Sequence, residues 1–367
     1  MATLLLGFFL LFSLIILAYY LAFFAFANNT SKNPGKLNLP VSVIVCAKNE
    51  AENLRNFLPP ILDQDYPDFE VIVINDASHD ETLEVIENFQ ALDGRVKLVD
   101  VQNNEAFWAN KKYALTLGIK KAKNPYLIFT DADCAPQSRN WITHMAAGFQ
   151  EEKSIVLGYG GYFKNSKSLL NKLIRFETLL TAIQYFSYAK LGNPYMGVGR
   201  NLAYTSKQFY DQKGFANHLH LRSGDDDLFV NEGGNEENTF ICHHPEASTR
   251  SVPKTDLKSW FKQKRRHASV AGFYKTKDKV LLGLFYASRF FFWILLAALL
   301  IIQFQWQLVL GVAGFVLLVQ AVVYAKSAKK LEETDVVWLF PFLEVFLIFT
   351  QFGIFIANSV SKPTHWK

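Results

Sequence analysis

The chain begins with 26 residues, Ala2–Ala27, that include no charged side chain. As a helix rising ~1.5 Å per residue, this segment would be about 39 Å long, enough to cross the ~30 Å hydrocarbon layer of a membrane. A cleaved signal peptide usually has a basic start and a shorter apolar core. The uncharged start and the length therefore favour an uncleaved membrane anchor over residues 2–27.

A second apolar region lies near the other end of the chain. Residues 290–325 carry no charge, are too many for one crossing, and are interrupted by a polar patch at 303–307. We expect two spans here, over 280–302 and 306–325, joined by a tight hairpin. A further span over 336–357 gives three C-terminal membrane helices within residues 280–357.

Two ionisable residues fall inside these spans. Arg289 either reaches the headgroups, faces protein, or precedes the true start of its span. Glu344 either lines a passage for lipid or substrate, or bonds to a neighbouring helix.

Lysines beside the spans predict the orientation. Lys32 and Lys36 follow the first span, and Lys326, Lys329 and Lys330 follow the third, whereas the hairpin at 303–307 has none. The positive-inside rule then places residues ~30–280 in the cytoplasm and both termini outside, in a multi-pass protein of the cell membrane.

Composition narrows the class of protein. The net charge of +5 is too small to indicate nucleic acid as a partner. Only 19% of the residues are charged, below the ~25% of ordinary soluble proteins, so the composition argues against that class. Cys46, Cys134 and Cys242 are odd in number and far apart, so they predict neither a disulfide framework nor a zinc site. We therefore expect the soluble part in a reducing compartment.

Residues 40–252 read as a soluble domain in which apolar strands alternate with helices. Strands are expected over 41–46, 70–74, 96–101, 126–130 and 155–162, and helices from 52, over 78–89 (capped by Ser78 or Asp80), over 108–122 and over 168–190. This alternation predicts an α/β fold with a mostly parallel sheet. Such sheets bind ligands at the carboxyl ends of their strands. Residues 254–275 read as a basic amphipathic helix in the membrane interface.

Acidic and basic side chains collect where the predicted strands end. Asp131 and Asp133 follow one strand, where alternate residues point to the same side and two carboxylates can hold Mg²⁺ or Mn²⁺ with substrate phosphates. Asp76 ends another strand and either bonds to a ribose or base, or caps a helix. Lys111 and Lys112 open a helix and either meet a diphosphate or face solvent.

Two more clusters lie later in the chain. Asp225, Asp226 and Asp227 are consecutive, so repulsion raises at least one pKa and favours a general base, although a helix N-terminus enriched in Asp is the alternative. Residues 263–267, Gln-Lys-Arg-Arg-His, place donors near the membrane. They either bind phosphate or only fix the topology.

In this order and spacing, the motifs resemble family 2 glycosyltransferases with the GT-A fold, such as cellulose synthase, hyaluronan synthase and ceramide glucosyltransferase. The resemblance covers residues 40–268. The matching segments are Val41-Ser42-Val43-Ile44-Val45, Asn75-Asp76-Ala77-Ser78, Thr130-Asp131-Ala132-Asp133-Cys134, Gly197-Val198-Gly199-Arg200-Asn201, Ser223-Gly224-Asp225-Asp226 and Gln263-Lys264-Arg265-Arg266-His267.

The resemblance implies inverting transfer from a nucleotide-diphosphate sugar to a lipid or lipid-linked saccharide. The implied roles are nucleoside contact by Ala47, Glu50 and Asp76, nucleotide and metal contact by Asp131 and Asp133, and lining of the donor and acceptor site by Gln263, Arg265 and Arg266. Asp226 would abstract the proton, and a shift of one residue would give this role to Asp225 or Asp227. The cofactor would be Mg²⁺ or Mn²⁺.

One departure concerns the acceptor. The family motif ends in Trp, and this chain has His267 in its place. We therefore expect addition of a single sugar, with processive polysaccharide synthesis as the alternative. A non-catalytic membrane scaffold that keeps the nucleotide-binding fold is the alternative of another class. The sequence identifies neither the sugar nor the nucleotide.

Overall fold

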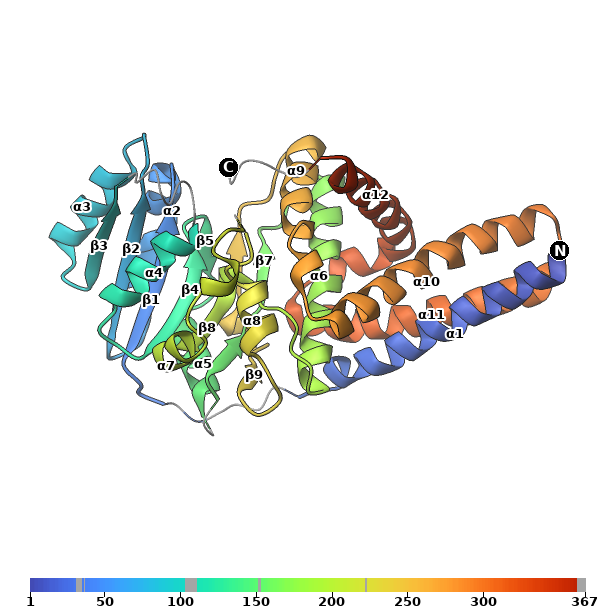
Figure 1. Cartoon of the computed structure of the whole chain (residues 1–367), viewed down its shortest axis with the longest axis horizontal. Coiled ribbons are helices and arrows are strands. Elements are labelled where there is room, and N and C mark those ends of the chain that lie inside the picture. The colour runs from blue at the N-terminus through green and yellow to red at the C-terminus, as the bar shows by residue number, and fades with distance from the viewer. Residues whose placement is uncertain (31–34, 36, 103–110, 151–152, 222, 362–367) are drawn as a thin grey trace. The chain divides into compact units, whose positions relative to one another are not determined.

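The computed structural model describes all residues except 31–34, 36, 103–110, 151–152, 222 and 362–367. The predicted helix start at Trp108 and the flanking Lys32 and Lys36 lie outside the described residues. The chain divides into two compact units (Figure 1). The first comprises Met1–Thr30, Ser166–Leu191 and Thr255–Pro363, and the second comprises Ser31–Asn165, Gly192–Lys254 and Thr364–Lys367.

The second unit is an α/β domain with two sheets among its described residues. The larger has the order β3-β2-β1-β4-β8-β6-β9, and the smaller has the order β5-β10-β7. Strands β1 to β4 pair in parallel, while β8 is antiparallel to both of its neighbours, so the predicted α/β class with a mostly parallel sheet is confirmed. The strands are β1 (Val41–Ala47), β2 (Phe69–Asp76), β3 (Val96–Val101), β4 (Tyr126–Asp131), β5 (Cys134–Pro136), β6 (Ile155–Leu157), β7 (Gly160–Tyr162), β8 (Leu202–Thr205), β9 (Thr239–Ile241) and β10 (Thr249–Ser251).

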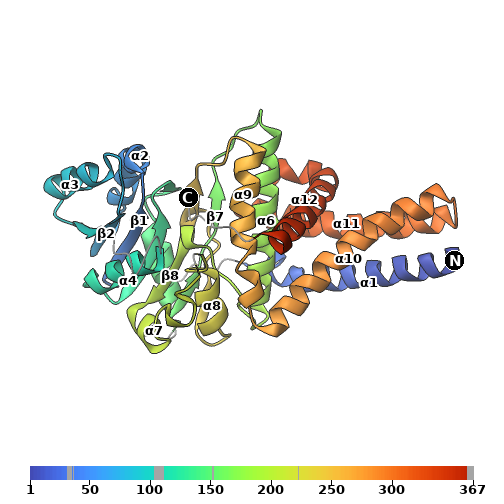
Figure 2. The same ribbon diagram turned by 45° about the horizontal axis from the view of Figure 1, so that its top comes forward.

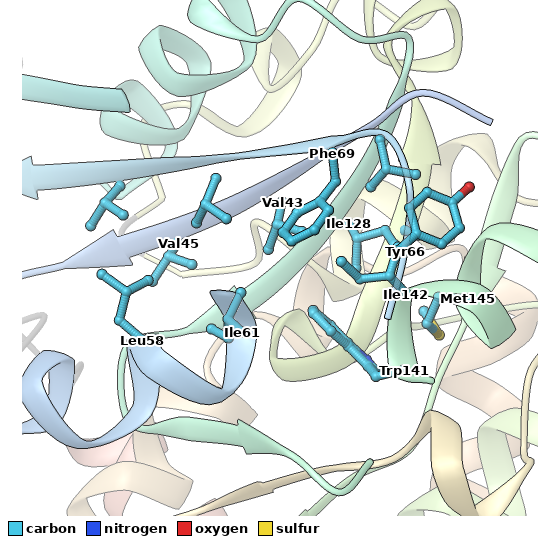
Figure 3. Packing of buried hydrophobic residues seen from close by; sticks show 14 of the residues in the cluster. Val43, Val45, Leu58, Ile61, Tyr66, Phe69, Ile128, Trp141, Ile142 and Met145 are labelled. Atoms are coloured by element: carbon cyan, nitrogen blue, oxygen red, sulfur yellow. The ribbon is translucent and has the colours of Figure 1, made fainter. Parts of the chain in front are cut away.

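Helices cover both faces of the larger sheet. On one face, Val43 and Val45 of β1 pack with Leu58 of α2 and Trp141 of α5 (Figure 3). On the other, α4 lies so close that a Cβ at Gly118 would be 2.4 Å from the side chain of Ile74. Alternate strand residues therefore bury opposite faces, as covered parallel sheets require. The helices of this unit are α2 (Ala51–Leu62), α3 (Thr82–Leu92), α4 (Lys111–Lys121), α5 (Trp141–Ala146), α7 (Ser206–Asp211) and α8 (Asp227–Gly233).

Two local predictions were wrong. The expected strand 155–162 is split between the two sheets, because the backbone leaves β6 at Gly158, where a Cβ would lie 2.5 Å from the side chain of Asn201. The helix expected from Ser78 begins at Thr82. Ser78 accepts a hydrogen bond from the backbone N–H of Asn49 in the β1–α2 loop. Asp80 accepts from the backbone N–H of Ala51 and also from that of Thr82, the first residue of the helix.

The first unit is helical, and four of its described helices are long and apolar enough to cross a membrane. These are α1 (Ala2–Ala27), α10 (Thr276–Ile301), α11 (Trp306–Leu331) and α12 (Phe340–Val360), the last preceded by a 3₁₀ turn that belongs to the same span. One N-terminal and three C-terminal spans confirm the predicted set. The hairpin predicted around 303–307 is present between α10 and α11.

Aromatic contacts tie α6 (Leu169–Lys190) to these apolar helices. Phe186 stacks on Phe26 of α1 at 4.9 Å between ring centroids, and Phe176 contacts Tyr324 of α11 at 5.3 Å. Helix α6 also runs beside α9 (Leu257–Ala268), where Lys264 pairs with Glu177 at 2.5 Å (Figure 2). The middle of the chain thus supplies one helix to the unit that holds the spans.

The two ionisable residues inside the spans bind each other. Nε of Arg289 on α10 donates to Oε1 of Glu344 on α12 at 2.9 Å, and both side chains are at most 2% exposed. Of the predicted alternatives, the structure shows Arg289 facing protein and Glu344 bonded to a neighbouring helix. A buried charge without its partner would destabilise the fold. The pair therefore favours the relative position of α10 and α12 that keeps the two side chains in contact.

This pairing predicts a non-additive mutational effect. Arg289→Met leaves Glu344 buried without its partner and should destabilise the purified protein by about 3–5 kcal/mol, measured as a lowered Tm in detergent. The double substitution Arg289→Met with Glu344→Leu should recover most of that loss. Lys262→Met, at an exposed position of α9, serves as control. Additive losses in the double variant would contradict the pairing.

Candidate active site

The carboxyl ends of three parallel strands meet at one edge of the larger sheet. Ala47 at the end of β1 lies opposite Asn75 of β2, and Cys46 lies opposite Asp131 of β4. Asp76 is the last residue of β2. The register therefore gathers Ala47, Asp76 and Asp131 at the edge where such sheets bind their ligands.

Lys111 joins the strand edge to the later acidic cluster. As the first residue of α4, it places Nζ 3.1 Å from Oδ1 of Asp131 and 3.0 Å from Oδ2 of Asp225. Burial alone would lower the pKa of Lys111, but the two carboxylates outweigh it and hold that pKa well above its ordinary value. Lys111 is therefore charged at neutral pH and balances two acidic groups that come from distant parts of the sequence.

Asp226 is held by backbone donors at the start of α8. Its Oδ2 accepts from the backbone N–H of Gly199 at 2.7 Å, and its Oδ1 accepts from that of Asp227 at 2.8 Å. Burial and the charge of Asp225 raise its pKa, against the opposing effects of Lys111 and these two hydrogen bonds. The carboxylate is fixed in place and is a stronger base than an ordinary Asp.

The three acidic neighbours occupy different environments. Asp225 pairs with Lys111, while Asp227 is buried and its Oδ1 accepts from the N–H of Leu228 at 2.8 Å. Asp226 lines the same pocket as Lys111, Asp131 and Asp225. The structure thus brings the predicted residues Lys111, Asp131, Asp225 and Asp226 together.

Asp131 and Asp133 have the chemistry of a site for a hard divalent cation. Their carboxylates and the Sγ of Cys134 each offer an atom within 4.8 Å of the others. The Cys134 thiol donates to Oδ1 of Asp133 at 3.3 Å, and burial raises the pKa of this thiol. The two carboxylates supply hard oxygen ligands, which suit Mg²⁺ or Mn²⁺. Burial and the charge of Asp131 raise the pKa of Asp133, a cost that a bound cation would remove.

Asp76 offers a buried acceptor. Asp76 is 5% exposed, and its Oδ2 accepts no hydrogen bond from the residues that the structure describes. The Nζ of Lys48 lies 3.6 Å from this oxygen. Glu50 accepts from the amide of Asn53 and contributes to the raised pKa of Asp133. Ala47 is buried in β1.

The four predicted residues of α9 belong to the other unit. Arg265 donates from Nε to Asn358 Oδ1 at 3.0 Å and from Nη2 to the carbonyl of Ala357 at 2.9 Å, at the C-terminal end of α12. The Oε1 of Gln263 is buried and has no partner within the described part of the chain. Arg266 and His267 follow Arg265 on the same helix. In this structure Arg265 therefore serves to hold α12.

Arg200 lies in the glycine-rich segment 197–201, and the sequence predicts no role for its side chain. The Arg200 guanidinium lies 4.2 Å from the ring centroid of Tyr162 and donates to the carbonyl of Gly161 at 3.2 Å. Its charge opposes the rise in the pKa of Asp133. Its own carbonyl accepts from Thr130 at 3.0 Å. The sequence feature that could have indicated a role for Arg200 is its position as a basic residue within a glycine-rich segment.

Lys112 has a different role from Lys111. Its Nζ is buried and donates to the carbonyls of His218, Leu221 and Ser223 at 2.8, 3.0 and 2.7 Å. These carbonyls belong to the loop that leads into Asp225. Neither predicted alternative, diphosphate contact or a solvated face, describes this side chain, because three carbonyls surround its ammonium group.

Removal of these donors gives a testable consequence. Lys112→Met should destabilise the protein by about 2 kcal/mol or more, because buried carbonyls lose their donors, and should lower its Tm. Lys120→Met, at an exposed position on the same helix, is the matched control. Equal Tm values for Lys112→Met and the control would show that the loop does not depend on Lys112.

Comparisons with known proteins concern the domain that carries most of these residues. Residues 42–215 match the glycosyl transferase family 2 domain. Poly-beta-1,6-N-acetyl-D-glucosamine synthase of Staphylococcus epidermidis is 37% identical over 93 residues, which are 25% of this chain and 21% of that protein. An uncharacterized glycosyltransferase of Haemophilus influenzae is 32% identical over 124 residues, 34% of this chain and 36% of that protein. The matched segments thus span only a fifth to about a third of these relatives.

The fold also has a solved counterpart. The mannosyltransferase PcManGT from Pyrobaculum calidifontis, solved in complex with GDP-Man and Mn²⁺, aligns with 92% of this chain and 98% of its own, with a TM-score of 0.59 and 17% identity. That likeness concerns the fold. Together with the matched domain, it identifies the fold of the second unit as GT-A-like, and residues 42–215 are similar to the glycosyl transferase family 2 domain.

Proposed function

We propose that the protein is an inverting glycosyltransferase that moves a sugar from a nucleotide-diphosphate sugar to a lipid or lipid-linked saccharide at the cytoplasmic face of the cell membrane. The observation that carries this proposal is the joining of Asp131 and Asp225 through Lys111. Asp131, one of the two carboxylates suited to a cation, lines the same pocket as Asp225 and Asp226, which are suited to proton abstraction.

Donor binding would involve the strand edge. The Oδ2 of Asp76, which lies 3.6 Å from Lys48 Nζ and accepts no hydrogen bond from a described residue, is a ready acceptor for a nucleoside hydroxyl or amino group. Ala47, at the end of the neighbouring strand, and Glu50 are proposed to contact the same nucleoside. Asp131 and Asp133 would hold Mg²⁺ or Mn²⁺, which when bound neutralises charge that develops on the leaving diphosphate. The solved mannosyltransferase of similar fold binds a nucleotide sugar and Mn²⁺, which supports this class of donor and cofactor.

Asp226 is the best candidate for the base. Inversion needs a carboxylate that removes the acceptor proton as the hydroxyl attacks the sugar from the face opposite the leaving group. Asp226 is oriented by two backbone N–H groups and has a raised pKa, whereas Asp225 is occupied by Lys111. We assign proton abstraction to Asp226 and charge balance to Asp225.

The acceptor is assigned from the membrane helices. Four described helices are long and apolar enough to span a membrane, so a lipid-borne acceptor is presented at the surface where the enzyme resides. Processive synthesis is the second candidate, favoured by the similarity to a poly-beta-1,6-N-acetyl-D-glucosamine synthase. The roles that the sequence resemblance implies for Gln263, Arg265, Arg266 and His267 on α9, as groups that line the donor and acceptor site, stay predictions.

A donor screen tests the function. Purified protein in lipid nanodiscs with UDP-, GDP- and dTDP-sugars and Mn²⁺ should release nucleoside diphosphate from one donor, and EDTA should stop the release. Asp226→Asn should lower kcat about 10²–10⁴-fold with little change in donor affinity, because a general base contributes about that factor. Asp133→Asn should weaken Mn²⁺-dependent donor binding. Asp68→Asn, at an exposed position, is the control.

Mass spectrometry of the extracted lipids would separate addition of one sugar from a ladder of products. A wild-type protein that turns over no donor, or variants as active as wild type, would favour the scaffold alternative.

The raised pKa of Asp226 predicts an acid limb in the rate profile. The base acts only when ionised, so kcat/KM should fall as the pH drops through a value above the ~3.9 of an ordinary Asp. Removing the neighbouring charge with Asp225→Asn should move this limb to lower pH, because the charge of Asp225 contributes to the raised pKa. A limb that stays in place would rule out Asp226 as the titrating group.

A further inference from the structure

A second group of metal-ligating side chains lies on elements that the carboxylate site does not use. His144 is in the last turn of α5, and His244 and Glu246 belong to the loop and 3₁₀ turn at Pro245–Ala247. Each of the three offers a ligand atom within 4.8 Å of the others.

We propose that His144, His244 and Glu246 form a binding site for a transition-metal ion of the zinc class. Nε2 of His144 lies 3.2 Å from Oε2 of Glu246. Two ligands of a tetrahedral Zn²⁺ at ~2.0–2.1 Å from the ion lie about 3.3 Å from each other, so this pair already has the required spacing. The set of two histidines, one carboxylate and a water matches known zinc coordination.

The two rings lie against each other, and the carboxylate is held by a neighbour. His144 and His244 stack with ring centroids 4.0 Å apart and planes at 18°. A ligated metal lies in the plane of an imidazole ring, so one ring has to turn out of this stack for both to bind the same ion. Asn140 Nδ2 donates to Oε2 of Glu246 at 3.0 Å. An amide that orients a ligating carboxylate is a common second contact around metal ions.

The protonation states also suit a metal. Burial and the facing ring of His144 lower the pKa of His244, which favours the neutral imidazole. Hydrogen bonds from Asn140 and His144 lower the pKa of Glu246, which favours the carboxylate. Neutral imidazole and charged carboxylate are the forms that bind metal.

Binding would replace two contacts. Ligation by Nε2 of His144 ends its 3.2 Å hydrogen bond to Oε2 of Glu246. The second contact involves His244. The N–H of Glu246 donates to Nδ1 of His244 at 3.3 Å, a long hydrogen bond. Ligation through Nδ1 uses that lone pair, and ligation through Nε2 leaves the proton on Nδ1. Either way, a long hydrogen bond gives way to a metal–nitrogen bond.

The two sites differ in the ions they prefer. Imidazole ligands favour Zn²⁺, Co²⁺ or Ni²⁺, whereas carboxylates alone favour Mg²⁺ or Mn²⁺. The histidine site joins α5 to the turn before β10, whose Thr249 Oγ1 donates to the carbonyl of Arg200 at 2.8 Å. A metal here would brace the smaller sheet, and its existence does not depend on the proposed reaction.

Cobalt spectroscopy tests this site. Full-length protein without a histidine tag is stripped with EDTA and titrated with Co²⁺ in excess Mg²⁺, which occupies the carboxylate site. Wild type and Asp133→Ala should both show a visible d–d band with one equivalent of Co²⁺, and Zn²⁺ should remove it. His144→Gln, His244→Gln and Glu246→Gln should each weaken binding more than about tenfold, since even outer contacts contribute about 10–100-fold.

His79→Gln, at an exposed position, is the matched control and should bind as wild type does. Glu246 is partly exposed, so its variant reports on the site if a histidine variant does not fold. The proposal fails if wild type gives no band, or if the three variants bind Co²⁺ as tightly as the control.

Discussion

The ammonium group of Lys111 is the interaction on which the candidate site depends. It stands about 3 Å from carboxylates of Asp131 and Asp225, which are far apart in sequence. Without a cation between them, these acids and Asp226 would repel one another, and a compact pocket of this kind would be unfavourable. Helix α4 carries Lys111 at its first position and packs on β1 and β2 through Gly118, so the sheet itself sets where that charge lies.

The glycine-rich segment 197–201 connects this charge arrangement to the rest of the domain. The N–H of Gly199 holds Asp226, and the carbonyl of Arg200 accepts from Thr130 and Thr249, which belong to different sheets. The side chain of Asn201 accepts from Trp141 Nε1 and donates to the carbonyls of Tyr159 and Ala247. Because these partners come from both sheets and from α5, the position of Asp226 depends on the packing of the whole domain.

The sequence predicted the strands before residue 131 well, because buried β-branched runs ended by polar residues leave little choice of structure. It also predicted the four spans and the meeting of Asp131 with the 225–226 pair. It failed where tertiary contacts decide. Whether residues 155–162 form one strand depends on Asn201 filling the space beside Gly158. Ser78 bonds to a neighbouring loop, and the helix expected from it begins only at Thr82, whose N–H bonds to Asp80. Lys112 and Arg200 bind carbonyls and a ring that no local pattern reveals.

The place of α6 in the fold affects how this protein can be handled. The helix is encoded in the middle of the chain, yet its aromatic side chains contact Phe26 of α1 and Tyr324 of α11. A fragment lacking the terminal helices would keep α6 and expose those rings to water, together with the buried Arg175 that Glu333 and Asp335 neutralise. We therefore expect that removing the terminal helices leaves a fragment prone to aggregate in water.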